Sequence, residues 1–146
     1  GYDTFTGKPD KAPDANGSRR ACLERQAMAP LAREPMGVVA NASNVGATIL
    51  RYTGHRSLSA PYHRNQGGML AELHIGMSPP DLAKRYMDDA GVTLLAFCVD
   101  DPQIGSIERE APDGLYAELA KGNVPAWLEP VPETLGQPLV IYRYRP

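Results

Sequence analysis

One stretch of the chain gathers most of the side chains that could do chemistry. Residues 54–66 read GHRSLSAPYHRNQ and hold two of the three histidines, two arginines and a tyrosine. The side chains that we expect to contact a ligand or partner are His55, Arg56, Tyr62, His63, Arg64 and Asn65. The guanidinium group of an arginine can bind a phosphate or carboxylate through two hydrogen bonds, and His63 can donate or accept a proton. The alternative is a loop whose polar groups pair with one another and with backbone ends.

No other motif completes a catalytic site. Asp100 and Asp101 could bind a cation at the end of a strand, although a turn or a helix cap is the commoner role for such a pair. Trp127 could stack on a sugar, or anchor its loop on the core. The chain has no GxSxG, Walker, HExxH or GxGxxG motif, and nothing in it indicates a metal or a cofactor. We therefore expect no catalytic residue in the chain by itself.

Apolar runs and their breakers predict the elements that must position these side chains. Strands are expected at 36–40, 56–60, 92–99 and 139–144, and helices at 19–32, 45–52, 67–75, 79–90 and 115–120. The unbroken apolar run 92–99 is typical of a mid-sheet strand, whereas the alternating run 139–144 indicates an edge strand that could be antiparallel. This order predicts one small three-layer α/β domain over 19–146, with a mostly parallel sheet of about four strands and flanking helices. Residues 1–18 lack periodicity and are expected to form a linker or arm.

The predicted fold places part of the segment 54–66 where a ligand could bind. The group His63–Asn65 would follow the carboxyl end of the strand at 56–60, where open α/β sheets hold their ligands. The helix at 67–75 begins directly afterwards, so its free N–H groups could also face an anion.

Composition excludes some classes of function and leaves the compartment open. The net charge of −2 and the pI near 5.9 argue against a nucleic-acid-binding protein and give little attraction to an anionic membrane. No apolar run approaches the roughly 20 residues that cross a bilayer. The two cysteines, Cys22 and Cys98, lack CxxC spacing, and from spacing alone a disulfide and a pair of free thiols remain equally open. A disulfide would indicate an oxidising compartment.

Three segments together resemble a known family. They are Ala60-Pro61-Tyr62-His63-Arg64-Asn65 followed by a helix, Gly91-Val92 entering a strand that ends in Cys98, and the PAWLEP run at 125–130. The set resembles the C-terminal soluble region of large polytopic inner-membrane proteins of Gram-negative bacteria, of the GT-C glycosyltransferase type. The resemblance covers roughly residues 20–146, and the APYHRN string is its most specific part.

The resemblance implies a location, partners and a bond. In that family the C-terminal domain hangs in the periplasm, tethered to the inner membrane through the membrane-embedded remainder of the same polypeptide. The class transfers sugars from lipid-linked donors, and its catalytic acids lie in the membrane part. The resemblance implies that Cys22 and Cys98 form a disulfide, and that the partners are this remainder and a lipid-linked sugar or glycan. It assigns no role to the side chains of 62–65.

Three functional hypotheses follow. The first is an accessory periplasmic domain, not catalytic alone, that helps to recognise or position a lipid-linked sugar or an acceptor. The second is an interaction module that binds a glycan or a protein. The third is a small enzyme that acts on an anionic substrate through His63 and Arg64. The third lacks a nucleophile or paired acids around these two residues.

Overall fold

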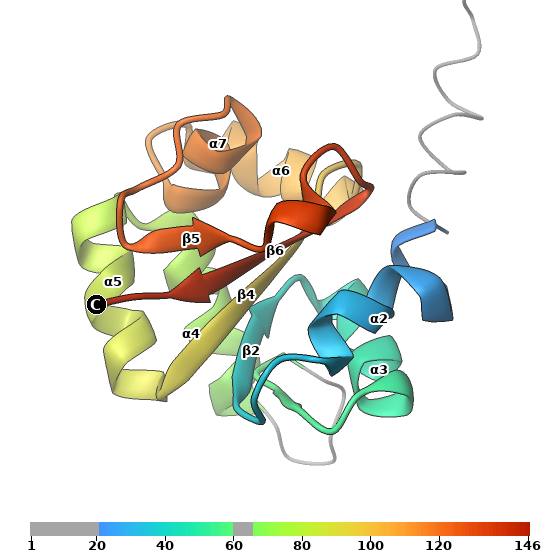
Figure 1. Ribbon diagram of the computed structural model, residues 1–146. Helices are drawn as coiled ribbons and strands as arrows, with labels where there is room; N and C mark the ends of the chain where they lie inside the picture. The colour runs from blue at the N-terminus through green and yellow to red at the C-terminus, as the bar shows by residue number, and fades with distance from the viewer. Residues whose placement is uncertain (1–20, 60–65) are drawn as a thin grey trace, which may run out of the picture.

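The computed structural model describes residues 21–59 and 66–146 (Figure 1). Its strands are β2 (Val38–Asn41), β3 (Arg56–Ser57), β4 (Val92–Cys98), β5 (Leu128–Pro130) and β6 (Leu139–Tyr144). Its α-helices are α2 (Arg25–Ala32), α3 (Ser43–Tyr52), α4 (Gln66–Met77), α5 (Pro80–Ala90), α6 (Pro102–Glu110) and α7 (Leu115–Ala120), and η1 (Pro132–Thr134) is a short 3-10 helix. Among the described helices, none combines the length and the apolar character that crossing a membrane requires.

The strands form one mixed sheet in the order β3-β2-β4-β6-β5. The pairs β3–β2 and β2–β4 are parallel, whereas β4–β6 and β6–β5 are antiparallel. The predicted α/β domain is therefore confirmed, and β4 lies in mid-sheet as its apolar run indicates. The prediction of an edge position for 139–144 is wrong, because residues 128–130 pair with its outer side as β5.

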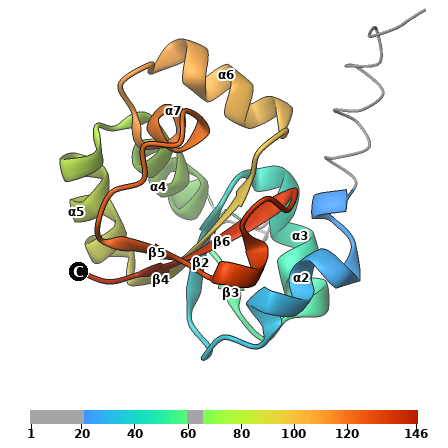
Figure 2. The ribbon, with the colours of Figure 1, turned by 45° about the horizontal axis from the view of Figure 1, so that its top comes forward.

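The sheet is covered on both faces, which makes three layers. Figures 1 and 2 both show α2 and α3 on one side of the sheet and α4 to α7 on the other. The alternation along β6 fits this arrangement, because Leu139 and Ile141 pack with the α2–α3 side while Val140 and Tyr142 pack with the other. Residues 139–144 alternate between two apolar faces, so their pattern is that of a covered strand.

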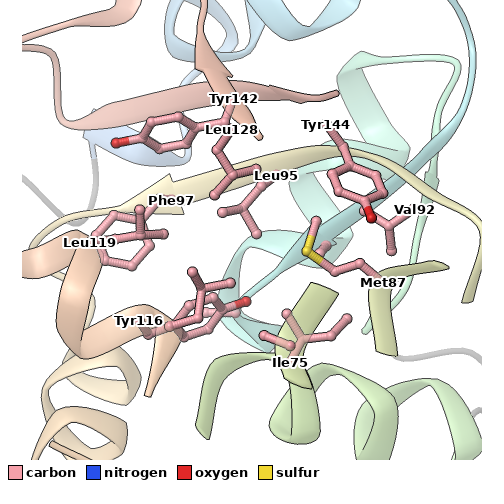
Figure 3. Close-up of a cluster of buried hydrophobic side chains, with 14 of the residues drawn as sticks. Ile75, Met87, Val92, Leu95, Phe97, Tyr116, Leu119, Leu128, Tyr142 and Tyr144 are labelled. Carbon is pink, nitrogen blue, oxygen red and sulfur yellow. The ribbon is translucent and has the colours of Figure 1, made fainter. Parts of the chain in front are cut away.

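The larger of the two cores lies between the sheet and α4 to α7. Figure 3 shows side chains from both layers meeting there, and Phe97 and Tyr116 contact each other edge to face with ring centroids 5.6 Å apart. Met87 and Ile75 are fully buried in the same cluster. Each such side chain stabilises the fold by about 1.5–3 kcal/mol.

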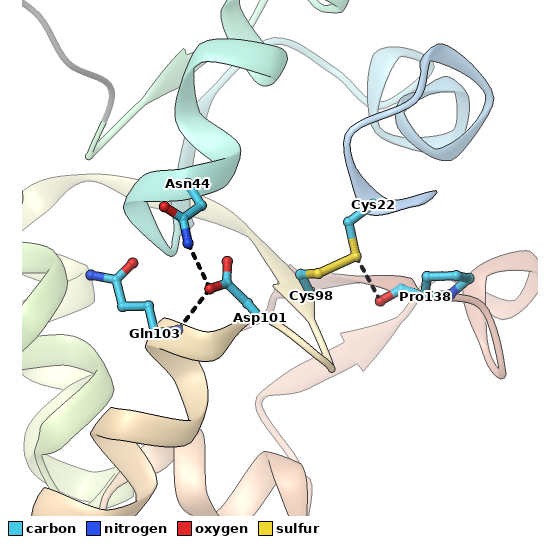
Figure 4. The surroundings of a disulfide bond; sticks show 6 residues. All are labelled: Cys22, Asn44, Cys98, Asp101, Gln103 and Pro138. Carbon is cyan, nitrogen blue, oxygen red and sulfur yellow. Dashed lines mark hydrogen bonds between the residues drawn. A yellow bond between two sulfur atoms is a disulfide. The ribbon is translucent and has the colours of Figure 1, made fainter. Parts of the chain in front are cut away.

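A disulfide joins the α2 layer to the central strand. Cys22 and Cys98 are bonded, with their Cα atoms 6.0 Å apart, and both are buried (Figure 4). Their separation of 76 residues closes a long loop, and in the chain-entropy view such a bond stabilises by about 4–5 kcal/mol. The disulfide implied by the family resemblance is confirmed.

Some predicted boundaries differ from the observed ones for local reasons. Helix α5 ends at Gly91, which takes the expected left-handed conformation with φ 70°. Gly54 follows the helix expected at 45–52 and would by its residue type be a left-handed helix end, but this expectation is wrong, because Gly54 is not among the described glycines with a positive φ. Helix α3 ends at Tyr52, and Thr53 after it is extended. The hydroxyl of Thr53 donates to the Ile49 carbonyl at 2.7 Å and closes the helix instead.

Candidate functional site

The candidate site lies where the three parallel strands end. Because β2, β3 and β4 run in the same direction, their carboxyl ends meet at one edge of the sheet. Asn41 is the last residue of β2, Ser57 ends β3, and Ser59 follows it. This is the edge at which open α/β sheets place their ligands.

Asn41 is the centre of a buried hydrogen-bond network at this edge. Its Oδ1 accepts from the Ser57 hydroxyl at 2.8 Å, and its Nδ2 donates to Ser59 Oγ at 3.0 Å and to the Ala42 carbonyl at 2.6 Å. Ser59 in turn donates to the Asn41 backbone carbonyl at 2.7 Å. All three side chains are buried, so the network fixes β3 against the end of β2.

Glu72 joins this network from α4. Its Oε1 accepts from the Asn41 backbone N–H at 2.8 Å, and the residue is only 2% exposed. Burial raises the pKa of Glu72 well above its usual range, and the Asn41 N–H opposes this shift only in part. Within the part of the chain that the structure describes, Oε2 is buried and has no hydrogen-bond partner. The arrangement therefore favours a neutral carboxyl group that has one hydrogen bond still to make.

A second buried acid, Asp101, contacts the first turn of α3, which follows β2. Its Oδ1 accepts from the Gln103 N–H and from Asn44 Nδ2, both at 2.8 Å (Figure 4). Asp101 is the N-cap of α6, which agrees with the cap role expected for it. Its Oδ2 is buried without a hydrogen-bond partner in the described residues. Two carboxyl groups thus flank the segment Asn41–Asn44, each with one oxygen that the described fold leaves unused.

His55 lies at the opposite end of the strands. It precedes β3, and its Nδ1 accepts from the Gly37 N–H at 3.1 Å while Nε2 donates to the Leu31 carbonyl at 2.7 Å. These partners assign the proton of the neutral ring to Nε2. His55 is buried, whereas Arg56 next to it is exposed. The structure does not bring His55 together with the Asn41 network, and both its ring nitrogens are occupied.

The remaining predicted contact residues, Tyr62, His63, Arg64 and Asn65, lie outside the described residues. Their role in contacting a ligand stays a prediction. No three His, Cys, Asp or Glu side chains within residues 21–59 and 66–146 are placed to hold a metal ion.

The Asn41 network was not expected from the sequence alone, in which no ligand-contacting role was predicted for Asn41, Ser57, Ser59 or Glu72. A usable signal was present at Glu72, because it is the one carboxyl group in a helix that is otherwise apolar apart from His74 and its first residue. Such a group on the buried face of a helix needs a partner in the fold.

Comparison by sequence finds no similar protein: no protein-family model matches the chain, and no curated protein does. Comparison by structure finds the C-terminal globular domain of an oligosaccharyltransferase from Archaeoglobus fulgidus, known from a crystal structure. The likeness covers 97% of this chain and 100% of that domain, with a TM-score of 0.61 and 10% sequence identity. At this identity the likeness shows the fold alone. The fold is thus one that the C-terminal domain of an oligosaccharyltransferase also has, and at this level it agrees with the family resemblance.

Proposed function

We propose that this domain works outside the cytoplasm as the soluble part of a membrane-embedded glycosyltransferase-like protein, where it helps to position a lipid-linked sugar or its acceptor. In this proposal the domain is tethered to the bacterial inner membrane on the periplasmic side, and it is not catalytic alone. The observation that carries the proposal is the likeness, over nearly the whole chain, to the C-terminal domain of an oligosaccharyltransferase.

Two features of the chain support the proposal. The disulfide Cys22–Cys98 suits an oxidising compartment, because thiols in the bacterial cytoplasm are kept reduced. The edge at Asn41 and Glu72 is where an α/β sheet holds a ligand, and the segment 60–65 comes directly after Ser59 of the Asn41 network in the sequence. We place the ligand or the membrane part against this edge, with His63 and Arg64 as contacts.

A membrane-association experiment tests this function. Nanodiscs are prepared with a polyprenyl-phosphate-linked sugar, with the polyprenyl phosphate alone, or with phospholipid only, and the chain is titrated onto each. We expect retention that depends on the sugar, loss of retention in the double variant His63→Ala and Arg64→Ala, and no release of free sugar. Equal retention on all three nanodiscs, or none, would contradict the proposal.

The same samples distinguish the enzymatic alternative. Release of sugar by the chain alone, abolished by His63→Ala, would support the hypothesis of a small enzyme acting on an anionic substrate. Arg109→Ala serves as the control for loss of a cation, because Arg109 is exposed and lies on α6.

One observation favours the interaction module as a second candidate. Helix α4 exposes four large apolar side chains, namely Met69, Leu70, Leu73 and Met77, and α5 exposes Leu82. Half of the exposed large apolar side chains in the described residues thus belong to two adjacent helices. A concentration of this kind is typical of a contact surface. In the proposed function this surface contacts the membrane-embedded remainder of the same polypeptide.

A further inference from the structure

A shallow hollow between α4 and α5 combines an aromatic pair, a free carboxylate and an apolar floor. Its walls are formed by Gly67, Leu70, Ala71 and His74 of α4 and by Tyr86, Asp89 and Ala90 of α5. It is separate from the Asn41 network, because Glu72 is on the buried face of α4 and these side chains line the outer face. Leu70 belongs to the contact surface described above, but His74, Tyr86 and Asp89 have no role in that surface or in the Asn41 network.

The two aromatic rings in the hollow contact each other. His74 and Tyr86 lie with their ring centroids 4.9 Å apart and their planes inclined by 36°. His74 is exposed and Tyr86 half-buried, so both remain accessible from solvent. An aromatic ring offers an apolar face together with a polar edge, which suits the C–H face of a pyranose.

The polar group at the hollow is the carboxylate of Asp89, which is free to bind a ligand. Asp89 is exposed and has no hydrogen-bond or ion-pair partner in the described part of the chain. An ionised carboxylate accepts strong hydrogen bonds, and it would repel an anionic ring. At the other end, a Cβ at Gly67 would meet no atom within 4 Å, so the hollow opens to solvent there. Apolar walls with a few convergent polar groups are the usual composition of a small-molecule site.

We propose that this hollow is a carbohydrate subsite that takes a neutral pyranose ring, stacked on Tyr86 and hydrogen-bonded through its hydroxyls to Asp89. The inference rests on the proposed function and deepens it: the hollow would hold one pyranose of the lipid-linked sugar, while the edge at Asn41, with His63 and Arg64, would contact another part of the same ligand. Leu70, which is 54% exposed, borders the hollow and belongs to the apolar face of α4. An apolar tail attached to the sugar can therefore lie along Leu70, Leu73 and Met77, between α4 and the membrane-embedded remainder of the polypeptide.

Two-dimensional amide NMR of the unmodified chain, titrated with small glycosides, tests the subsite. The probes are β-octyl glycosides of glucose, mannose and N-acetylglucosamine, used below their micelle concentrations, and a sugar-free octyl triethylene glycol ether. We expect saturable shifts at His74, Tyr86 and Asp89 with at least one glycoside, and no saturable shift at these residues with the ether. Asp89→Asn should weaken the glycoside's affinity about tenfold, because hydrogen bonds to a charged acceptor are lost.

Matched variants separate binding from folding. Asp81→Asn removes an exposed carboxylate of the same helix that does not line the hollow, and it should leave the affinity unchanged. Tyr86→Leu removes the ring, and Tyr52→Leu removes a half-buried ring on α3 instead. Absence of saturable shifts with every glycoside, equal shifts with the ether, or an Asp89→Asn variant that binds as well as Asp81→Asn would each overturn the subsite.

Failure of the subsite and failure of the proposed function give different results. Sugar-dependent nanodisc retention that Asp89→Asn leaves unchanged would overturn the subsite and leave the proposed function standing. Saturable NMR shifts with a glycoside, without sugar-dependent retention on nanodiscs, would overturn the proposed function and leave the subsite standing.

Discussion

Asn41 uses every hydrogen-bonding group of its side chain inside the protein, whereas Glu72, which binds its backbone N–H, leaves one oxygen unpaired. The difference matters because a buried polar atom without a partner costs about 1–3 kcal/mol. Such a cost at the carboxyl edge of parallel strands is what a ligand-binding role would explain. The titration of Glu72 and the partners of the buried polar atoms can both be tested by substitution of single residues.

Glu72 should make the stability of the fold depend on pH. Its pKa in the folded state is raised above the ordinary value of 4.5, chiefly by burial. Below pH 4.5 the carboxyl group of Glu72 is protonated in both the folded and the unfolded state, and its contribution to the stability of the fold is fully present. As the pH rises toward the folded pKa the unfolded state ionises first, so stability is lost. Glu72→Gln should flatten this fall in the free energy of unfolding, as measured by urea denaturation across the acidic to neutral range.

Glu34 provides the opposite control for that experiment. The hydrogen bonds from Arg143, at 2.8 and 2.9 Å, lower the pKa of Glu34. The contribution of Glu34 to stability is therefore present above its ordinary pKa, and it is lost as the pH falls through the lowered pKa of the folded state. Glu34→Gln should cost stability at neutral pH and not in acid. A parallel pH dependence in the two variants would contradict the assignment of Glu72.

Two of the core tyrosines on the α4–α7 side, Tyr116 and Tyr144, should respond in opposite ways to loss of the hydroxyl. Tyr116 is 1% exposed, and its hydroxyl has no partner in the described residues. Tyr144 donates its hydroxyl to Asp88. We expect Tyr116→Phe to raise the free energy of unfolding by about 1 kcal/mol and Tyr144→Phe to lower it by a similar amount. Thermal denaturation of both variants checks this, and a destabilised Tyr116→Phe would mean that its hydroxyl is satisfied.

At the scale of elements, the fold depends on a close contact between the end of α4 and the start of α7. The Leu115 N–H donates to the Ser78 carbonyl at 2.8 Å, and Gly114 lies against the α4 backbone. A Cβ on Gly114 would lie 2.8 Å from the carbonyl oxygens of Gly76 and Met77. Only glycine allows the two helices to approach this closely.

Alanine substitutions at two glycines test that contact. Gly114→Ala should lower the free energy of unfolding by about 1–3 kcal/mol, because backbone atoms must move to admit the methyl group. Gly105→Ala is the matched control, since Gly105 is inside α6 and a Cβ there would meet only the end of the Arg109 side chain at 3.6 Å. It should stabilise by about 0.5–1 kcal/mol. Equal effects of the two substitutions would contradict the close packing of α4 and α7.

The sequence predicted well those elements whose apolar runs are long. The central strand at 92–99 and the helix ended by Gly91 are found within one or two residues of their expected bounds. Helix α6 was missed because the prolines and glycines around it resembled a loop, although Asp101-Pro102 is a cap followed by proline in the first turn. Strand β5 was missed because three residues that include Pro130 give no strand pattern.

The candidate site was predictable only in its location. The rule that ligands lie beyond the carboxyl ends of parallel strands indicates the edge of the sheet at which the Asn41 network is found. The Asn41 network was not predictable, because it joins residues from three segments whose pairing only the folded sheet establishes. His55 was grouped with the site by sequence proximity, yet one strand length separates it from that edge.

At the scale of the whole molecule, the disulfide links the layer of α2 and α3 to the sheet, against which this layer packs through the smaller of the two cores. Helices α2 and α3 pack on the sheet through the smaller core, and Cys22 precedes α2 while Cys98 ends β4. Replacing both cysteines by alanine should lower the free energy of unfolding by about 2–5 kcal/mol. Guanidinium denaturation measures this, and the natural chain treated with reductant should approach the same value. An unchanged midpoint would show that the bond constrains nothing.

The compartment is the claim on which the whole account depends, and one measurement tests it most directly. The chain is isolated from its native cell with free thiols blocked at lysis, denatured without reductant, and weighed intact by mass spectrometry. Because Cys22 and Cys98 are buried together, we predict a monomer with neither cysteine blocked and a mass lower by two hydrogen atoms, as an oxidised domain outside the cytoplasm should have. A monomer that carries the blocking group on both cysteines would place the chain in a reducing compartment and contradict the account.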